Sequence, residues 1–234
     1  MRPGEDRDLE PKGAGIVVVG GRVDDDDVVG AIFEHLATVR GTRWRRRETQ
    51  AVTSTAGRLL LAEPMLGDPN FDRTVVLMVE HTSDGAMGLV LNRPTDLAVH
   101  DALPAWQPFA TAPSVLHVGG PVEARSGWCL ARLTPGVEGV GFLPVLGDLG
   151  LLDLEVDPTE LAGELTAARF YAGYSGWGPG QLDDELTHDA WIVVDAMRDD
   201  PFLPDPEELW RQILLRQGGR LARLSLFPRD PSLN

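Results

Sequence analysis

The amino-acid sequence predicts an α+β protein whose mixed, mostly antiparallel sheet is flanked by helices. Short runs of β-branched and apolar residues recur along the chain between glycine and proline turns, which is typical of strands. Three or four other segments carry the apolar spacing or the start signals of helices. Strands and helices do not alternate strictly, and this argues against a doubly wound parallel sheet.

A strand hairpin forms the centre of the predicted sheet. Thr74–His81 is a run of β-branched and apolar residues, and Gly88–Leu91 is a second one. Asp84-Gly85 between them is a turn signal, because glycine reaches positive φ without a Cβ clash. Pro94 ends the second strand by removing a backbone donor. Because both strands are almost wholly apolar, we expect both faces of the hairpin to be buried.

The first 57 residues differ in composition from the rest of the chain. The apolar residues of Val28–Val39 fall on one helical face, and Asp24–Asp27 suit the N-terminal end of that helix. Arg43–Arg47 is a basic segment that fits either a solvated linker or a contact with nucleic acid or an acidic partner. Gln50–Gly57 is small and polar. We therefore predict an N-terminal extension, residues 1–57, and a main domain, residues 58–234.

The main domain shows further strand and helix signals. Strands are predicted at Arg58–Glu63, Ser114–Val118, Trp128–Leu133, Ala167–Tyr174 and Trp191–Asp195, with one or two more in Val137–Leu154. Thr95 can cap a helix that ends before Pro104. The capping boxes that start at Asp157 and Asp205 predict two further helices, the first through Leu161 and Leu165 and the second closed by Gly218.

Charge and cysteine content indicate an acidic protein of a reducing compartment. The net charge is −15, and residues 58–234 carry 12 basic and 26 acidic residues. This acidic body repels polyanions, which argues against direct DNA binding by it. The single cysteine, Cys129, excludes an intrachain disulfide and is typical of a small buried side chain. No apolar run approaches the roughly 20 residues of a membrane helix, so a cytoplasmic location is expected.

Several separate blocks resemble the YqgE/AlgH family of bacterial proteins, in the same order as in that family. They are Leu59-Leu60-Leu61-Ala62, Asp68-Pro69-Asn70-Phe71 with Arg73-Thr74-Val75, Glu80-His81, Gly88–Pro94, Gly119-Gly120-Pro121-Val122 and Gly173–Leu182. The resemblance implies an α+β domain with a bifurcated sheet that forms a pseudo-barrel. It implies no cofactor, and AlgH-type members have been named as transcriptional regulators without a recognised DNA-binding motif. Residues 1–57 have no counterpart in the family pattern.

Candidate ligand-binding residues lie at strand ends and glycine turns. Asn92 and Arg93 end a buried strand, and they offer a ligand an amide and a planar guanidinium fork. The structural alternative is that Asn92 stabilises a turn and Arg93 pairs with a carboxylate such as Glu80. The remaining candidates are Gly119, Gly120, Tyr174, Trp177 and His81. Gly173–Leu182 lacks the Gly-Lys-Ser/Thr of a phosphate loop and favours a structural role. The histidines lack zinc-ligand spacing, so no metal site is predicted.

These observations favour a non-enzymatic binding protein. Its ligand is a small molecule or a protein partner that no motif identifies, and a regulatory role through a partner is compatible with the acidic body. The alternative is a hydrolase or transferase that uses His81, Asn92, Arg93 and an acid among Asp183–Glu185. An enzyme needs these groups in one concave pocket, so their positions in the fold discriminate between the two hypotheses.

Overall fold

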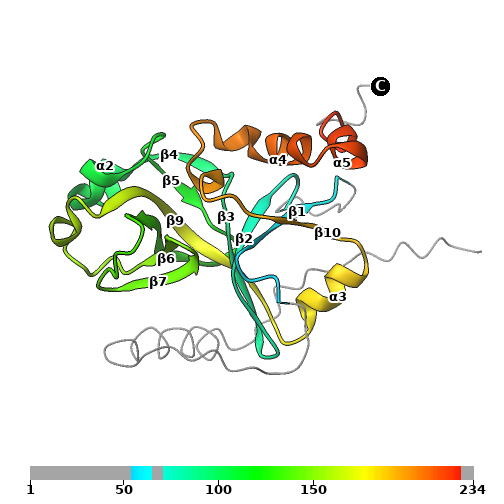
Figure 1. The fold of residues 1–234 in the computed structure, drawn as a ribbon, viewed down its shortest axis with the longest axis horizontal. Helices are drawn as coiled ribbons and strands as arrows, with labels where there is room; N and C mark the ends of the chain where they lie inside the picture. Colours follow the sequence, from blue (N-terminus) through cyan, green and yellow to red (C-terminus); the bar gives the residue numbers. More distant parts are fainter. Residues whose placement is uncertain (1–53, 65–70, 228–234) are drawn as a thin grey trace, which may run out of the picture.

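The computed structural model describes residues 54–64 and 71–227 and has the predicted α+β architecture (Figure 1). A mostly antiparallel sheet runs through the molecule, with α4 (Leu209–Gln217) and α5 (Gly219–Leu224) along one side and α3 (Gln181–Thr187) near one end. The expected helix at 28–39 and the basic segment at 43–47 lie outside the described residues.

Ten strands and several short helical segments make up the described part of the chain. The strands are β1 (Arg58–Ala62), β2 (Val75–Thr82), β3 (Gly85–Val90), β4 (Pro94–Ala98), β5 (Val115–Val118), β6 (Val122–Leu133), β7 (Phe142–Leu146), β8 (Leu149–Leu152), β9 (Leu165–Trp177) and β10 (Trp191–Asp195). The short helical segments are α2 (Val99–Ala102), η1 (Pro104–Phe109), η2 (Pro158–Leu161), η3 (Asp200–Phe202) and η4 (Pro206–Glu208).

The long strand β9 divides the sheet into two branches. Along one edge it pairs with β6, and along the other it pairs first with β5 at residues 170–172 and then with β3 at residues 175–177. One branch continues from β3 through β2 and β1 to β10, and the other from β5 to β4. The sheet is therefore bifurcated. Its main path runs from β10 to β7 without closing, so the pseudo-barrel description is corrected to an open sheet.

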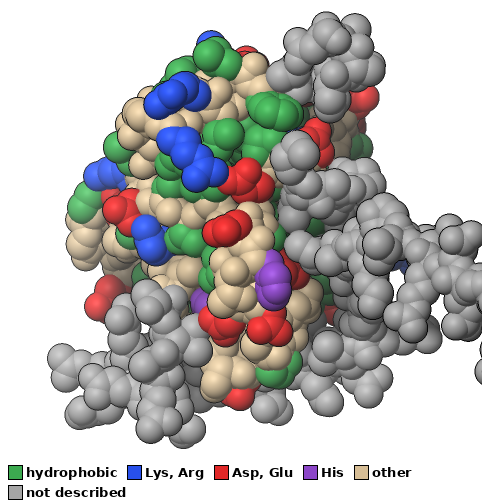
Figure 2. Space-filling model, turned by 90° about the vertical axis from the view of Figure 1, so that its right-hand side faces the viewer, with side chains coloured by type: hydrophobic (Ala, Val, Ile, Leu, Met, Phe, Trp, Pro, Cys, Tyr) green, Lys and Arg blue, Asp and Glu red, His purple; other side chains and the backbone are tan. Residues whose placement is uncertain are grey.

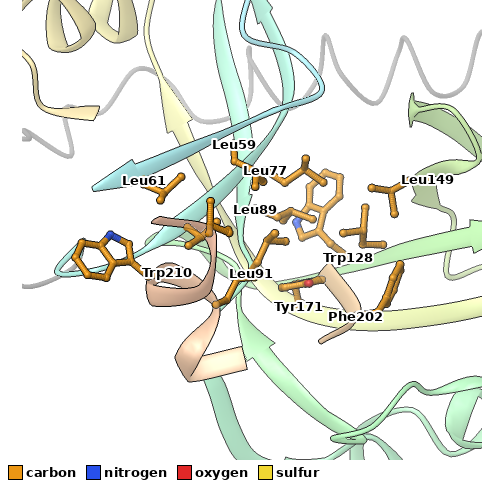
Figure 3. Close-up of a cluster of buried hydrophobic side chains, with 14 of the residues drawn as sticks. Leu59, Leu61, Leu77, Leu89, Leu91, Trp128, Leu149, Tyr171, Phe202 and Trp210 are labelled. Carbon is orange, nitrogen blue, oxygen red and sulfur yellow. The ribbon is translucent and has the colours of Figure 1, made fainter. Parts of the chain in front are cut away.

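The predicted central hairpin is confirmed as β2 and β3. Val76 pairs with Val90 and His81 with Ala86, and a register shift falls between Met78 and Glu80. Leu77 and Leu89 enter the largest apolar cluster, together with Trp128, Tyr171 and Trp210 (Figure 3). The residues that alternate with these along the two strands, such as Val76 and Val90, point to the other face and enter a second cluster beside Phe71 and Trp191. Both faces of the hairpin are thus buried, which explains its apolar sequence.

Helix α4 covers one end of this hairpin. Its buried residues Leu209, Trp210, Ile213 and Leu214 pack into the largest apolar cluster. The indole Nε1 of Trp210 donates to the carbonyl of Ala62 at 3.0 Å, which fastens the helix to the end of β1. Gly218 ends the helix, as predicted, with a positive φ of 73° that favours glycine.

Two helix predictions are wrong in extent. The segment expected to form a helix from Thr95 is strand β4 up to Ala98, because it pairs with β5, and the Thr95 hydroxyl donates to the Leu116 carbonyl of that strand. The helix expected through Leu161 and Leu165 is only the single turn η2. Asp157 does accept from the Thr159 N–H at 2.9 Å, but the chain enters β9 at Leu165.

Candidate functional site

Asn92 closes the end of the hairpin at which β3 finishes. Its side chain is 3% exposed. The Oδ1 atom accepts from the Val75 N–H at 2.9 Å, and the Nδ2 group donates to the Arg73 carbonyl at 2.8 Å. The amide thus joins the end of β3 to the start of β2. Both sides of the Asn92 amide are occupied by backbone partners.

Two arginines flank this amide. Arg93 is half-buried and donates to the carbonyl of Asp72. Arg73 donates to the Phe227 carbonyl at 2.8 Å, and its guanidinium lies 5.3 Å from the centre of the Trp210 ring. The backbone of Arg73 has a φ of 52°, which a residue with a Cβ adopts only at a cost of order 1–3 kcal/mol. Backbone strain of this kind is concentrated at functional sites.

A pocket of about 270 Å³ opens where these residues meet the start of α4. Its lining is Asp72, Arg73, Asn92, Arg93, Pro94, Glu207, Glu208, Trp210 and Arg211. Three guanidinium groups and three carboxylates therefore surround it. The Asp72 carboxylate lies 3.9 Å from Arg73, and Glu208 lies 3.3 Å from Arg211. We call this site the Arg93 pocket.

His81 lies at the opposite end of the hairpin. Val75 and His81 are six residues apart along β2, a span of about 20 Å at the rise of a strand. The His81 Nδ1 atom accepts from the Thr55 N–H at 3.3 Å and lies 3.0 Å from the Thr55 hydroxyl. Its Nε2 atom lies 3.6 Å from an Asp183 carboxylate oxygen. The structure therefore does not bring His81 together with Asn92 and Arg93.

At this end of the hairpin, the side chains of Thr55, His81 and Asp183 form a structural connection between residue 55, β2 and α3. Because the Thr55 N–H donates to Nδ1, the proton of neutral His81 is on Nε2, which faces Asp183. Thr55 is 4% exposed and His81 is 6% exposed, so the hydroxyl is covered by the surrounding chain. The enzyme hypothesis required His81 and the Arg93 pocket residues to converge, and this geometry gives it no support.

Gly119 and Gly120 lie where three strands meet. A Cβ on Gly119 would be 2.2 Å from the Gly173 carbonyl oxygen, and one on Gly120 would be 2.2 Å from the Tyr174 backbone. The Gly119 carbonyl accepts from the Val90 N–H at 2.8 Å. These glycines are buried and let the turn between β5 and β6 approach the backbone of β9 closely.

Tyr174 and Trp177 are also buried, at 3% and 4% exposure. Tyr174 packs edge-on against Trp128 with ring centres 5.7 Å apart. The Trp177 Nε1 donates to the Glu185 carboxylate at 2.9 Å, and Trp191 donates to the same oxygen at 2.8 Å. Gln181 donates to the other Glu185 oxygen at 3.0 Å. This buried carboxylate fixes α3 to β9 and β10.

A separate buried polar cluster joins β5 and β9. The guanidinium of Arg169, 2% exposed, donates to the carbonyls of Pro201, Ala112 and Leu203. His117 is fully buried, and its Nδ1 donates to the Val115 carbonyl at 3.2 Å. Burial, with a smaller contribution from the nearby Arg169 charge, lowers the pKa of His117 to about 4. His117 is therefore neutral at pH 7.

Of the predicted candidates, Asn92 and Arg93 line the pocket, whereas the other five are buried elsewhere in the fold. Arg73, Trp210 and Arg211 are pocket residues that the prediction missed. Arg73 belongs to one of the sequence blocks that resemble the family, but only the fold shows that α4 packs beside it.

No cluster of three or more His, Cys, Asp or Glu side chains suited to a metal occurs in residues 54–64 and 71–227. Burial raises the pKa of the Cys129 thiol, which fits its structural role.

Comparison with known proteins places residues 59–222 in the AlgH-like family model. A UPF0301 protein of Streptomyces coelicolor is 49% identical over 187 residues, which cover 78% of this chain and 97% of the relative. One of Mycobacterium tuberculosis is 44% identical over 182 residues, covering 76% of this chain and 90% of the relative.

None of the helices in the described residues has the length and apolarity needed to cross a membrane.

Two solved structures are similar to this chain. A crystal structure of a Corynebacterium diphtheriae protein matches with a TM-score of 0.70 and 29% identity, covering 78% of this chain and 95% of that chain. The solution structure of the AlgH protein from Pseudomonas aeruginosa matches with a TM-score of 0.58 and 32% identity, covering 78% and 99%. The chain therefore belongs to the AlgH-like family.

Proposed function

We propose that this chain is a non-enzymatic, cytosolic binding protein whose ligand enters the Arg93 pocket. The observation that carries the proposal is the convergence of Arg73, Arg93 and Arg211 beside the Trp210 ring at one end of the sheet. A guanidinium offers a planar fork of donors that matches a carboxylate or a phosphate. The strained backbone of Arg73, held by Asn92, supports a functional rather than a purely structural role.

The charges around the pocket narrow the class of ligand. Its volume of about 270 Å³ suits a small molecule or the tip of a peptide. Besides the arginines, Glu207 and Glu208 at the start of α4 belong to the lining. A ligand with one acidic group and at least one hydrogen-bond donor satisfies both kinds of side chain. An amino-acid derivative or a peptide carboxylate has this chemistry.

Any effect on transcription would be exerted through a protein partner. Residues 58–234 carry a net charge of −14, from 12 basic and 26 acidic residues, and a body of this charge repels the DNA backbone. The absence of a recognised DNA-binding motif in the sequence agrees with an indirect role.

Mass spectrometry of compounds released from natively purified protein tests this proposal. The wild-type protein should release an acidic compound that Arg93→Ala does not retain. Arg125→Ala is the matched control, because Arg125 is an exposed arginine that does not line the pocket. Equal release from the wild type and Arg93→Ala would remove Arg93 from the site.

A further inference from the structure

The α4–α5 segment also carries a mixed basic and apolar surface outside the lining of the Arg93 pocket. Its inner side is committed to the core through Trp210, Ile213 and Leu214. The exposed side chains of this segment include both arginines and apolar residues. We call it the α4–α5 surface and define it by Leu215, Arg220, Arg223, Leu226 and Phe227.

The charge of this segment is opposite to that of the molecule. Residues 209–227 contain four arginines and no lysine, aspartate or glutamate, whereas the chain as a whole carries −15. Arg211 and Arg216 pair with Glu208 and Asp200. Arg220 and Arg223 are exposed, and their side chains form no hydrogen bond or ion pair with the part of the chain that the structure describes. Among the described residues, these two guanidiniums are therefore exposed and not committed to an intramolecular contact.

Apolar side chains accompany these two charges. Leu215 is 42% exposed, Leu226 73% and Phe227 38%, three of the seven large apolar side chains that are exposed among the described residues. In Figure 2, hydrophobic and arginine side chains gather on the upper part of the molecule, and acidic side chains occupy more of the lower part. A mixed apolar and basic surface of this kind is typical of a protein-docking site.

We infer that the α4–α5 surface docks an acidic, apolar segment of a partner protein. Charge complementarity is the reason, because this segment is a net-positive part of an acidic molecule. Arginine pairs with carboxylates, and the exposed leucine and phenylalanine side chains need an apolar partner that DNA does not offer. The favourable charge is local to residues 209–227, so the partner segment must reach these arginines without covering the acidic remainder of the chain.

Site-specific photo-crosslinking in the native cells tests this inference. A photo-crosslinking amino acid replaces Leu226 in the full-length chain, and in the control protein it replaces Arg125 on β6. The crosslinked peptides are then identified by mass spectrometry. At position 226 we expect adducts with another protein, on peptides richer in aspartate and glutamate than in lysine and arginine. At position 125 we expect no such adducts.

Variants establish which side chains make the contact. Arg220→Glu with Arg223→Glu should abolish the adduct at position 226, while Arg125→Glu should leave it unchanged. Circular dichroism and the melting temperature should be the same in all of these proteins, because the substituted side chains are exposed. The inference is overturned by an absent adduct, by an adduct equal to that of the control, or by an adduct with nucleic acid, lipid, a basic peptide or another copy of this chain.

Discussion

Asn92 and Arg93 are adjacent in the sequence and have different roles in the fold. The Asn92 amide satisfies one buried backbone donor and one backbone acceptor, so its contribution is to stability. Arg93 is half-buried and contacts the Asp72 carbonyl at the pocket wall. The sequence indicated that both stand at the end of a buried strand, but it could not separate these roles.

Substitution of the two residues should therefore affect different properties. Asn92→Ala leaves the Val75 N–H and the Arg73 carbonyl without their partner and should lower the free energy of unfolding by about 2–3 kcal/mol. Arg93→Ala should cost only about 1 kcal/mol, because Arg93 is half-buried and donates to a backbone carbonyl at the pocket wall. Urea unfolding monitored by tryptophan fluorescence measures both values. A loss of 3–5 kcal/mol in Arg93→Ala would instead identify a buried ion pair.

His117 should make the stability depend on pH. Its pKa is about 4 in the fold and 6.5 in the unfolded chain, so the unfolded chain binds the proton more tightly. As the pH falls from about 6.5 to about 4, the free energy of unfolding should decrease, by on the order of 3 kcal/mol in total. The free energy of unfolding of His117→Phe should not show this pH-dependent decrease. Urea unfolding of the wild type and of His117→Phe at pH 7 and pH 4.5 measures this difference. An equal decrease in the two proteins would show that His117 is not the source of the pH dependence.

At the scale of elements, α3 depends on a single buried carboxylate. A helix of seven residues is not stable alone, and Glu185 joins it to the indoles of β9 and β10. Glu185→Ala should leave the Trp177 and Trp191 N–H groups unpaired and lower the free energy of unfolding by on the order of 3 kcal/mol. Asp184→Ala serves as the control, because Asp184 stands on the same helix and is exposed. Equal stability of the two variants would show that packing alone holds α3.

Elements with strong local signals were predicted well, and elements decided by distant partners were not. The bounds of β10 and the Gly218 end of α4 follow from a β-branched run and a glycine signal. Residues 95–98 form a strand because β5, about twenty residues later, supplies its partner. The pocket residues Arg73 and Trp210 are far apart in the sequence and meet only because α4 docks on β1. Local patterns carry no information about such contacts.

At the scale of the whole molecule, β9 determines the architecture. It pairs with β3, β5 and β6, and the β5 pairing is parallel. A mixed sheet could be predicted from the absence of strict alternation, but the branch point could not, because it depends on buried glycines that let the backbones approach. The bifurcated sheet was predicted from the family resemblance and not from the periodicity of the sequence.

The main domain should fold without most of the extension. Removal of residues 1–53 should leave a cooperative thermal transition, because the described clusters are formed by residues from 59 onward. Removal of residues 1–57 should cost a further 1–2 kcal/mol or so, since it takes away the Thr55 partner of buried His81. Differential scanning calorimetry compares the two proteins. Loss of cooperativity in the first truncation would show that the extension completes the core.

An NMR titration tests most directly whether the Arg93 pocket binds an acidic ligand. Glycylglycine, which carries a carboxylate and N–H donors, is added to ¹⁵N-labelled protein, and the indole N–H signal of Trp210, assigned with Trp210→Phe, is followed. We expect a saturable shift of this signal in the wild type and in Arg125→Ala, and its loss in Arg93→Ala. An unchanged Trp210 signal, or the same shift in Arg93→Ala, would show that the pocket does not bind an acidic ligand through Arg93.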